Sequence, residues 1–305
     1  KNTESKTENN DESTKEEKTS VTITSLDSSK NEIELEVPYN PKRIAILDLA
    51  SLDIIDELGV GDRVVGMAST SIDYLEKYSN DSSIKNLGTI KEADLEAVME
   101  CEPDIIFIGG RLSNSYDALS EIAPVVYLAT DTNEGLVNSV SKNAKTIASI
   151  FGMEDKVNSL MSDFGARIDA IKKISSGKTA LVGMTTSGSF NLLGNDGRCS
   201  LIGVEAGFNN LTAAGSTSTH GNESSFETVV QQNPDYIFVM DRDSAISTAG
   251  AKTAKEIVEN ELVKTTDAYK NNHIIYLEHS NVWYTAEGGI QALDIMLTDL
   301  EKGLK

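Results

Sequence analysis

Two segments of the chain share one alternation of hydrophobic and polar positions. Residues 95–111 and 226–242 each contain a short amphipathic stretch, a Pro-Asp pair, an apolar run and a final arginine. Aligned at a constant offset, they are identical at seven of seventeen positions. A repeated helix and buried strand predict two similar α/β lobes, with each arginine at the carboxyl end of a strand. A cleft between such lobes would place Arg111 and Arg242 on facing sides.

On both sides of these segments, the pattern predicts strands that alternate with helices. Residues 21–37 alternate with period two around a polar turn, which is typical of a β-hairpin. The remaining patterns predict strands over 43–48, 64–68, 125–128, 179–184, 190–193 and 274–277, and helices over 51–58, 116–122, 136–151, 201–206, 253–260 and 286–304. Residues 279–285 are expected to form a loop. This alternation predicts mainly parallel sheets that are covered by helices on both faces.

A further helical pattern lies between the two repeated segments. From about residue 154 to residue 174, apolar side chains recur at intervals of three and four, as in an amphipathic helix. About twenty residues at about 1.5 Å each span roughly 30 Å, the width of a domain. The sequence therefore predicts an N-terminal lobe over 21–152, a connecting helix over 153–175 and a C-terminal lobe over 176–305. A surface helix that belongs to one lobe is the alternative interpretation.

The first twenty residues differ from the rest of the chain. Residues 1–20 contain no aliphatic or aromatic side chain. Such a segment buries too little apolar surface to offset the entropy lost on ordering, so we expect it to be disordered. It is either a plain terminus or a tether that holds the folded lobes off a membrane surface.

Composition and charge narrow the classes of function. The chain has 305 residues, enough for two domains with cores of their own, and its formal net charge is −21. So acidic a protein is not expected to bind nucleic acid, which needs a basic surface. The sequence has only six arginines, so any grouping of them is informative. It has no run of eighteen apolar residues, and its two cysteines form no C-x-x-C motif.

Common signatures of enzymes are absent from the sequence. It contains no G-x-S-x-G nucleophile elbow, no Walker A motif and no G-x-G-x-x-G fingerprint. Neither a Ser-His-Asp hydrolase nor a nucleotide-dependent enzyme therefore has support, and we expect no catalytic activity. Gly288 and Gly289 open a predicted helix and are suited to hold an anion, although a pair of glycines is weak support for a site.

Three of the six arginines lie in predicted loops or turns near strand ends. Arg111 and Arg242 end the repeated segments, and Arg198 lies in a glycine-rich turn. A single arginine after a strand is most often one half of a surface ion pair. Three of them favour an anion site, because open α/β sheets bind ligands beyond the carboxyl ends of their strands.

His220 and Tyr284 are candidate metal ligands. His220 lies in the polar loop 212–222, where burial does not account for it, although loop histidines are usually only solvated. His273 and His279 flank a predicted strand and are expected to be structural or exposed. Tyr284 precedes the last helix, and its phenolate oxygen is a hard ligand that suits Fe(III), as imidazole also suits iron. Packing of Tyr284 against the sheet is the alternative.

Glu96 and Glu227 occupy matching positions near the start of the two repeated helices, after Asp94 and Ser225 as expected caps. Acidic residues at this position complement the helix dipole, which accounts for them without a function. Their symmetric placement on two lobes also suits a partner with two-fold symmetry. Both interpretations fit the sequence.

Together these features resemble the substrate-binding proteins of bacterial ABC importers for ferric siderophores, haem and vitamin B12. The resemblance covers about residues 20–305. It rests on the hairpin leading into Tyr39-Asn-Pro-Lys-Arg-Ile-Ala-Ile-Leu-Asp48, on Asn86-Leu-Gly88, on the repeated Glu…Pro-Asp segments, on the mid-chain helix and on Trp283-Tyr…Gly-Gly289. It implies two α/β lobes with mainly parallel sheets, joined by a single long α-helix, with a ligand cleft between the lobes and little hinge motion. It implies a binding protein rather than an enzyme.

Within this family, the chain is most similar to proteins that bind ferric catecholate siderophores. The resemblance implies that Arg111, Arg198 and Arg242 line the cleft. It also implies that His220 and Tyr284 complete the coordination of Fe(III) when the siderophore is tetradentate. Fe(III) is then bound only as a siderophore complex, and no permanent cofactor is expected. A binding protein for haem, or for a hydroxamate or mixed-ligand ferric siderophore, is the alternative.

The resemblance further implies partners and a location. One acidic residue on each lobe, Glu96 and Glu227, would dock onto the permease dimer of an ABC transporter, and the binding protein itself is expected to be a monomer. Gram-positive members are lipoproteins anchored through a cysteine at the mature N-terminus, and residues 1–20 suit a tether behind such a cysteine. We therefore expect an extracytoplasmic, cell-surface lipoprotein of a Gram-positive bacterium rather than a free periplasmic protein.

Overall fold

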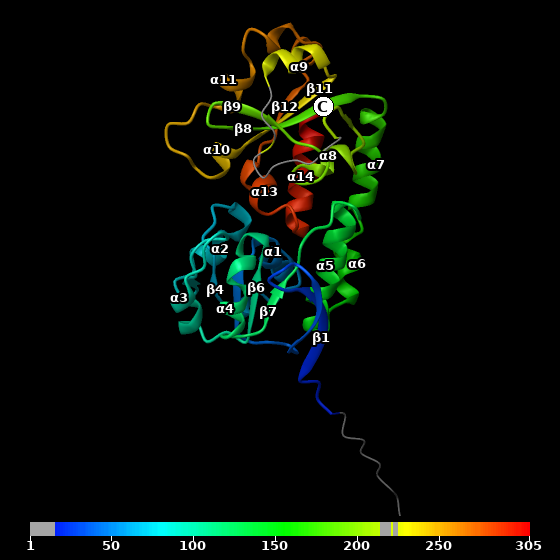
Figure 1. Ribbon diagram of the computed structural model, residues 1–305. Coiled ribbons are helices and arrows are strands. Elements are labelled where there is room, and N and C mark those ends of the chain that lie inside the picture. Colours follow the sequence, from blue (N-terminus) through cyan, green and yellow to red (C-terminus); the bar gives the residue numbers. More distant parts are fainter. Residues whose placement is uncertain (1–15, 214–220, 222–224) are drawn as a thin grey trace, which may run out of the picture.

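The computed structural model describes residues 16–213, 221 and 225–305, which form two α/β lobes, one above the other in Figure 1. The strands of the N-terminal lobe are β1 (Ser20–Leu26), β2 (Glu32–Pro38), β3 (Ile44–Leu47), β4 (Val64–Met67), β5 (Lys85–Asn86), β6 (Ile105–Ile108) and β7 (Val125–Tyr127). Its helices are α1 (Leu49–Glu57), α2 (Glu76–Ser79), α3 (Leu95–Glu100), α4 (Tyr116–Ser120) and α5 (Leu136–Ile150), with the 3-10 helices η1 (Gly61–Arg63), η2 (Asp73–Leu75) and η3 (Gly110–Ser115).

Two helices, α6 (Asp155–Met161) and α7 (Phe164–Ser175), lead to the C-terminal lobe. Its strands are β8 (Thr179–Thr186), β9 (Ser189–Leu192), β10 (Asn209–Asn210), β11 (Tyr236–Asp241) and β12 (Ile274–Tyr276). Its helices are α8 (Ser200–Gly203), α9 (Phe226–Gln232), α10 (Arg242–Ala245), α11 (Ala254–Val258), α12 (Asp267–Lys270), α13 (Ser280–Thr285) and α14 (Ile290–Gly303), with the 3-10 helix η4 (Val263–Thr265). Among the described residues, no helix has both the length and the apolar character needed to cross a membrane.

Each lobe is built around a mainly parallel sheet. The order is β5-β4-β3-β6-β7 in the N-terminal lobe, with every neighbouring pair parallel. The order is β10-β8-β11-β12 in the C-terminal lobe, again parallel, with β9 antiparallel to β8. The central strands β3 and β6 are wholly buried, as continuous apolar runs require when helices cover both faces. The predicted lobes and the hairpin β1–β2 are thus confirmed.

The repeated segments form the same helix–strand unit in both lobes. Helix α3 leads into β6 and helix α9 into β11, and each of these strands lies between two parallel neighbours. Asp94 caps α3 and Ser225 caps α9, each accepting a hydrogen bond from the backbone N–H three residues on. The predicted caps are therefore confirmed.

The repeated Pro-Asp pair also has one structural task in both lobes. The carboxylate of Asp104 accepts a hydrogen bond from the backbone N–H of Arg43 at 3.0 Å, just before β3. The carboxylate of Asp235 accepts one from the backbone N–H of Thr179 at 2.8 Å, at the start of β8. Each aspartate therefore fixes the register between its own strand and the first strand of the sheet.

The connecting helix is in the expected place, but it is not a single helix over 153–175. A two-residue turn, Ser162 and Asp163, separates α6 from α7 along the side of the molecule that joins the lobes (Figure 1). At the turn, Ser162 Oγ donates to the carbonyl oxygen of Ser159 at 2.9 Å. The backbone N–H of Ser162 donates to the same oxygen at 3.4 Å. Because the serine side chain competes with the helical hydrogen bonds, the prediction of one unbroken helix was wrong.

Residues 279–285, which we expected to form a loop, contain helix α13. Asp299 of α14 holds its first turn, because the carboxylate accepts hydrogen bonds from the backbone N–H of His279 at 3.0 Å and from Trp283 Nε1 at 2.9 Å. So short a helix depends on tertiary contacts more than on its own periodicity, which is why the pattern did not predict it. Helix α14 then begins at Ile290, later than the expected start at residue 286.

Candidate functional site

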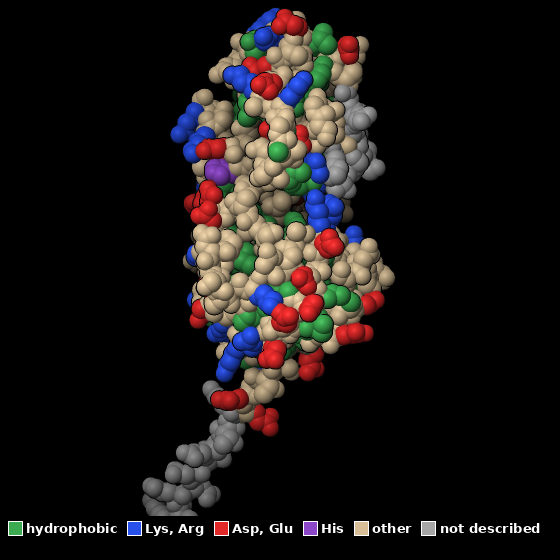
Figure 2. All heavy atoms as spheres, turned by 90° about the vertical axis from the view of Figure 1, so that its left-hand side faces the viewer, with side chains coloured by type: hydrophobic (Ala, Val, Ile, Leu, Met, Phe, Trp, Pro, Cys, Tyr) green, Lys and Arg blue, Asp and Glu red, His purple; other side chains and the backbone are tan. Residues whose placement is uncertain are grey.

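A cavity of about 560 Å³ lies between the lobes. From the N-terminal lobe it is lined by the segments that follow β3, β6 and β7, and from the C-terminal lobe by residues 197–198 and 284–288. Its volume is in the range of small-molecule sites, and its place at strand carboxyl ends is typical of open α/β sheets. Figure 2 shows a group of basic side chains at the waist between the lobes, in addition to the acidic and basic side chains that are spread over both lobes. A group of basic side chains between the lobes of an otherwise acidic protein favours an anionic ligand.

Tyr284 of α13 is the centre of this site. Its side chain is 4% exposed, and Arg242 Nε donates a hydrogen bond to its Oη at 3.0 Å. The guanidinium of Arg198 lies over the ring, 4.1 Å from the ring centroid, and Arg198 Nε donates to the carbonyl oxygen of Tyr284 at 3.0 Å. Two of the arginines predicted from the sequence are therefore in contact with the predicted tyrosine ligand.

The surroundings make the phenol of Tyr284 more acidic. Burial opposes its ionisation, but the hydrogen bond from Arg242 and the positive charges of Arg198, Arg242 and Lys91 outweigh burial, so the pKa of Tyr284 is lowered. A phenol with a lowered pKa loses its proton more readily when a metal cation competes for its oxygen. The site is therefore suited to present a phenolate oxygen to a hard metal ion.

The two arginines of the repeated segments have different surroundings. Arg242 begins α10 and is held by Tyr284 and by Thr186, whose Oγ1 accepts a hydrogen bond from Arg242 Nη1 at 3.1 Å. Arg111 lies in η3 with an exposed side chain, and no hydrogen bond or ion pair joins it to another residue of the described part of the chain. Gly110, which precedes it, lines the cavity. Arg111 is thus next in the chain to a residue that lines the cavity, and its role as a ligand contact stays a prediction.

His220 lies outside the described residues, so its role as a metal ligand also stays a prediction. The next residue, Gly221, is buried and has a φ angle of +77°. A Cβ atom at this position would lie 2.8 Å from Cβ of Asn191 in β9. Close contact with β9 and the left-handed backbone both require glycine there.

Two charged residues of the site were missed by the sequence analysis. Lys91, in the loop before α3, lines a second cavity of about 400 Å³ together with Tyr284. Glu287 lines the first cavity and accepts a hydrogen bond from the backbone N–H of Cys199 at 3.3 Å. Burial raises the pKa of Glu287 to about 7, although this hydrogen bond and the charge of Arg198 oppose the rise. Nothing in the local sequence distinguishes this lysine or this glutamate from the many exposed ones.

The start of α14, just after the glycine pair, does hold an anionic group, but this group is a carboxylate of the protein itself. Gly289 lies beside the carboxylate of Asp53, which accepts hydrogen bonds from the backbone N–H groups of Gln291 and Ala292. Burial raises the pKa of Asp53 to about 7 in spite of these hydrogen bonds. Gly289 is therefore part of the contact between the lobes, whereas Gly288 lines the cavity.

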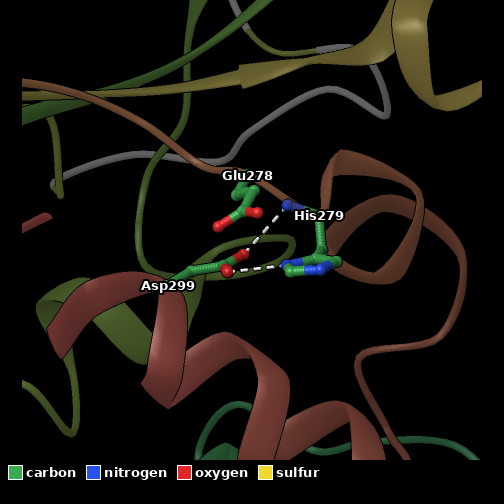
Figure 3. Close-up of side chains that lie close together, drawn as sticks. All are labelled: Glu278, His279 and Asp299. Carbon is green, nitrogen blue, oxygen red and sulfur yellow. Dashed lines mark hydrogen bonds and ion pairs between the residues drawn. The ribbon is translucent and has the colours of Figure 1, made fainter. Parts of the chain in front are cut away.

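A second group of possible metal ligands proves to be structural. Side-chain ligand atoms of Glu278, His279 and Asp299 lie within 4.8 Å of one another (Figure 3). Both oxygens of Asp299 are already occupied, because Oδ1 contacts His279 Nδ1 at 2.7 Å, and Oδ2 accepts from the backbone of His279 and from Trp283. His273 likewise bonds through Nδ1 to the carbonyl oxygen of Asp235 at 3.1 Å. These contacts agree with the expectation that His273 and His279 are structural or exposed.

Glu96 and Glu227 have exposed side chains in the first turns of α3 and α9, one on each lobe (Figure 1). On α3, two large apolar side chains flank the glutamate: Leu95 is 39% exposed and Met99 is 55% exposed. An acidic group beside exposed apolar surface is a combination found at protein interfaces. The docking role that we expected for both glutamates stays a prediction.

Comparisons with known proteins agree with this fold. A family model described as periplasmic binding protein matches residues 44–280. The petrobactin-binding protein YclQ of Bacillus subtilis is 38% identical over 277 residues, which covers 88% of this chain and 84% of YclQ. The crystal structure of YclQ matches with a TM-score of 0.85 at 36% identity, covering 93% of this chain and 99% of that one.

Two further relatives come from Vibrio species. The ferric-anguibactin-binding protein FatB of Vibrio anguillarum is 27% identical over 273 residues, covering 88% of this chain and 84% of FatB. The crystal structure of the periplasmic catecholate-siderophore binding protein VctP from Vibrio cholerae matches with a TM-score of 0.83 at 30% identity, covering 92% of this chain and 100% of that one. Sequence and structure thus agree over most of the chain, which belongs to the periplasmic binding protein family.

Proposed function

We propose that this protein binds a ferric catecholate siderophore outside the cytoplasm and delivers it to an ABC permease, without catalytic turnover. The observation that carries the proposal is the contact of Arg198 and Arg242 with the acidic phenol of Tyr284, at a cavity between the lobes. Relatives named for petrobactin, for ferric anguibactin and for catecholate siderophores support it.

The charge of such a ligand fits the basic site. Two catecholates bring four negative oxygens to Fe(III) and leave a complex of charge −1, and one phenolate ligand makes it −2. Arg198 and Arg242, together with Arg111, balance this charge and donate hydrogen bonds to catecholate oxygens. Lys91 adds a further positive charge next to Tyr284. An uncharged ligand would not make use of so many cationic groups.

Tyr284 and His220 are proposed as direct ligands of the iron. A tetradentate siderophore occupies four of the six octahedral positions of Fe(III), and one phenolate oxygen and one imidazole nitrogen fill the other two. A hexadentate siderophore leaves both residues without a metal contact. The lowered pKa of Tyr284 supports the first arrangement, because coordination requires the deprotonated phenol.

We further propose that the protein is a monomer held at the surface of a Gram-positive cell by a lipid anchor. The support is the composition of residues 1–20, which have no apolar side chain to bury and suit a tether between the anchor and the lobes. Cell fractionation with and without the enzyme that attaches the lipid tests the anchor. Release of the protein into the medium when lipid attachment is blocked supports the anchor, and unchanged retention contradicts it.

Titration with a panel of iron complexes tests the proposed ligand. The single tryptophan, Trp283, is buried next to Tyr284, so its fluorescence should be quenched when the cavity fills. We expect a dissociation constant below about 1 μM for a ferric bis-catecholate complex, worth about 8 kcal/mol, and much weaker binding of a ferric hydroxamate or haem. Tighter binding of haem, with a Soret band, or of the hydroxamate complex would replace the catecholate proposal by the corresponding one.

We predict that Glu287 makes the affinity for an anionic complex fall between about pH 6 and pH 8. With a pKa of about 7, Glu287 is mostly neutral at the lower pH and mostly charged at the higher one. A bound anion favours the neutral carboxyl group, so binding takes up a proton and weakens as the pH rises. Glu287→Gln should remove up to about a tenfold decline.

A hexadentate ferric catecholate is the ligand for this measurement, because Tyr284 then needs no deprotonation. Fluorescence titrations across the pH range compare the parent protein with Glu287→Gln, and Glu278→Gln, an exposed glutamate outside the cavity, is the control. Parallel pH profiles of the parent and the Glu287 variant would contradict the prediction.

We predict that Glu96→Gln with Glu227→Gln lowers iron uptake at least about tenfold without changing siderophore affinity. The exposed carboxylates are proposed to pair with cationic groups of the permease, and the loss of two such contacts weakens docking alone. ATP hydrolysis by the reconstituted transporter, with loaded binding protein, measures the effect. Asp117→Asn with Glu261→Gln, which also neutralises one exposed acid on each lobe, should leave ATP hydrolysis unchanged.

A further inference from the structure

Helix α14 in the C-terminal lobe is capped by a residue of the other lobe. Its N-cap, Gly289, has no side chain to offer. Asp53 of α1 takes its place: Oδ1 accepts a hydrogen bond from the backbone N–H of Gln291 at 2.9 Å, and Oδ2 accepts one from that of Ala292 at 3.0 Å. A Cβ atom on Gly289 would lie only 2.0 Å from Asp53 Oδ2. The glycine thus makes room for the carboxylate of the opposite lobe.

Helix α5 in the N-terminal lobe is capped in the same way from the other side. Its N-cap is also a glycine, Gly135, with a φ angle of +85° and no capping side chain. Glu205, which follows α8 in the C-terminal lobe, accepts hydrogen bonds through Oε1 from the backbone N–H groups of Leu136 at 2.5 Å and Val137 at 3.3 Å. A Cβ atom on Gly135 would lie 3.0 Å from the same oxygen. Each lobe therefore supplies a carboxylate that caps a helix of the other lobe.

The two contacts are equivalent under the duplication of the chain. Helix α1 follows the first strand of its sheet, and α8 follows the hairpin formed by the first two strands of the other sheet. Helices α5 and α14 each close their lobe. The carboxylates sit where helix dipoles favour negative charge and where unpaired N–H groups need acceptors. Their recurrence at equivalent places, each opposite a glycine N-cap, indicates a shared role in the relation of the lobes.

We propose that Asp53 and Glu205 are positioning residues that fix the separation of the lobes and so hold the ligand cavity at one width. Hydrogen bonds of this kind are lost when donor and acceptor move about 1 Å further apart. The caps also flank the cavity: Ile54, next to Asp53, and Gly288, next to Gly289, both line it. The effect on ligand affinity rests on the function proposed above, whereas the effect on lobe separation does not.

The connecting segment gives a reason for these additional contacts. The turn at Ser162 and Asp163 interrupts the hydrogen bonds of the helix between the lobes, although both residues keep helical backbone angles. Further hydrogen bonds support the first cap, because Gln291 Nε2 donates to Asp56 Oδ2 at 2.9 Å and Tyr74 Oη donates to Asp53 Oδ2 at 3.3 Å. The caps therefore add direct restraints between the lobes to those that the connecting helices supply.

Distance measurements between spin labels test the proposal. Cysteines introduced at Asp117 on α4 and Lys255 on α11, both exposed, carry one label on each lobe. The two native cysteines are buried, which raises the pKa of both thiols and protects them from labelling. Without ligand at about pH 8, the parent should give one narrow distance distribution. Asp53→Asn with Glu205→Ala should widen it at least about twofold.

Affinity for a ferric bis-catecholate should fall about tenfold in the same double variant, as expected when the competent arrangement drops to about a tenth of the population. Gly289→Ala offers an independent route if the double variant folds poorly, since its Cβ atom must displace the carboxylate of Asp53. It should widen the distribution as well.

Caps that act within one lobe provide the matched control. Asp94→Ala and Thr253→Ala remove the caps of α3 and α11, so they should lower the midpoint of thermal unfolding and leave the distance distribution unchanged. An unaltered distribution in both the double variant and Gly289→Ala overturns the proposal. If the distribution widens in the double variant but the parent protein binds no ferric siderophore, the positioning role is supported and the proposed function is overturned.

Discussion

Replacing Tyr284 with phenylalanine and His220 with alanine in one chain is expected to weaken binding of a tetradentate ferric bis-catecholate by roughly 1,000-fold, or about 4 kcal/mol. Replacing a residue that only orients a metal ligand already changes the affinity by about 10- to 100-fold. The loss of two direct ligands should therefore weaken binding by more than that. Water then fills both open positions on the iron, and the phenolate-to-iron charge-transfer band disappears. Fluorescence titration and visible absorption spectra measure the two effects.

Tyr284→Phe is an informative substitution because it changes little besides the phenol oxygen. It keeps the ring that lies 4.1 Å from the guanidinium of Arg198 and removes only the oxygen that accepts the hydrogen bond from Arg242. A hexadentate ferric catecholate is the matched control, since it leaves no open position, and its affinity should change less than about fivefold. If the tetradentate complex binds the double variant as tightly as the parent, Tyr284 and His220 are not iron ligands.

The local features of the fold were predictable because short segments of sequence determine them. Apolar runs such as 105–108 form buried central strands whatever surrounds them, and Asp94 and Ser225 mark helix starts through hydrogen bonds three residues away. The duplication added the relation between distant segments. It placed Arg242 at a strand end in the second lobe as Arg111 is placed near one in the first.

Features that depend on contacts between distant residues were not predictable. Helix α13 is stabilised by Asp299 of the next helix, which binds its first turn. A segment of six residues is too short to show the periodicity that would predict a helix. The raised pKa of Glu287 follows from its burial in the folded structure, which its neighbours in the sequence do not predict. The capping of α5 by Glu205 likewise joins residues about seventy positions apart. The sequence pointed to Gly289 as a place for an anion, but only the structure identifies that anion as Asp53.

Removing the positive charges of Arg198 and Arg242 is expected to weaken binding of every anionic ferric catecholate, whatever its denticity. Methionine at both positions keeps much of the side-chain volume and eliminates both guanidinium groups. Hydrogen bonds to charged groups contribute about 1.5 to 3 kcal/mol each, so two losses correspond to at least about 100-fold in affinity. The decline should be larger for the tetradentate complex, because the pKa of Tyr284 rises once neither arginine is near it.

The lysine variants separate charge from geometry. Arg198→Lys and Arg242→Lys keep the charge but lose the planar group that stacks on Tyr284 and donates in two directions, so they should recover only part of the affinity. Arg63→Met removes one positive charge from a site beside Asn40, away from the cavity, and should leave binding unchanged. Because pairing with the arginines is electrostatic, the affinity of the parent should also fall with added salt more steeply than that of the double methionine variant. Equal affinities of the parent and the double methionine variant, at low salt and with both classes of ligand, would show that these two arginines do not hold the anion.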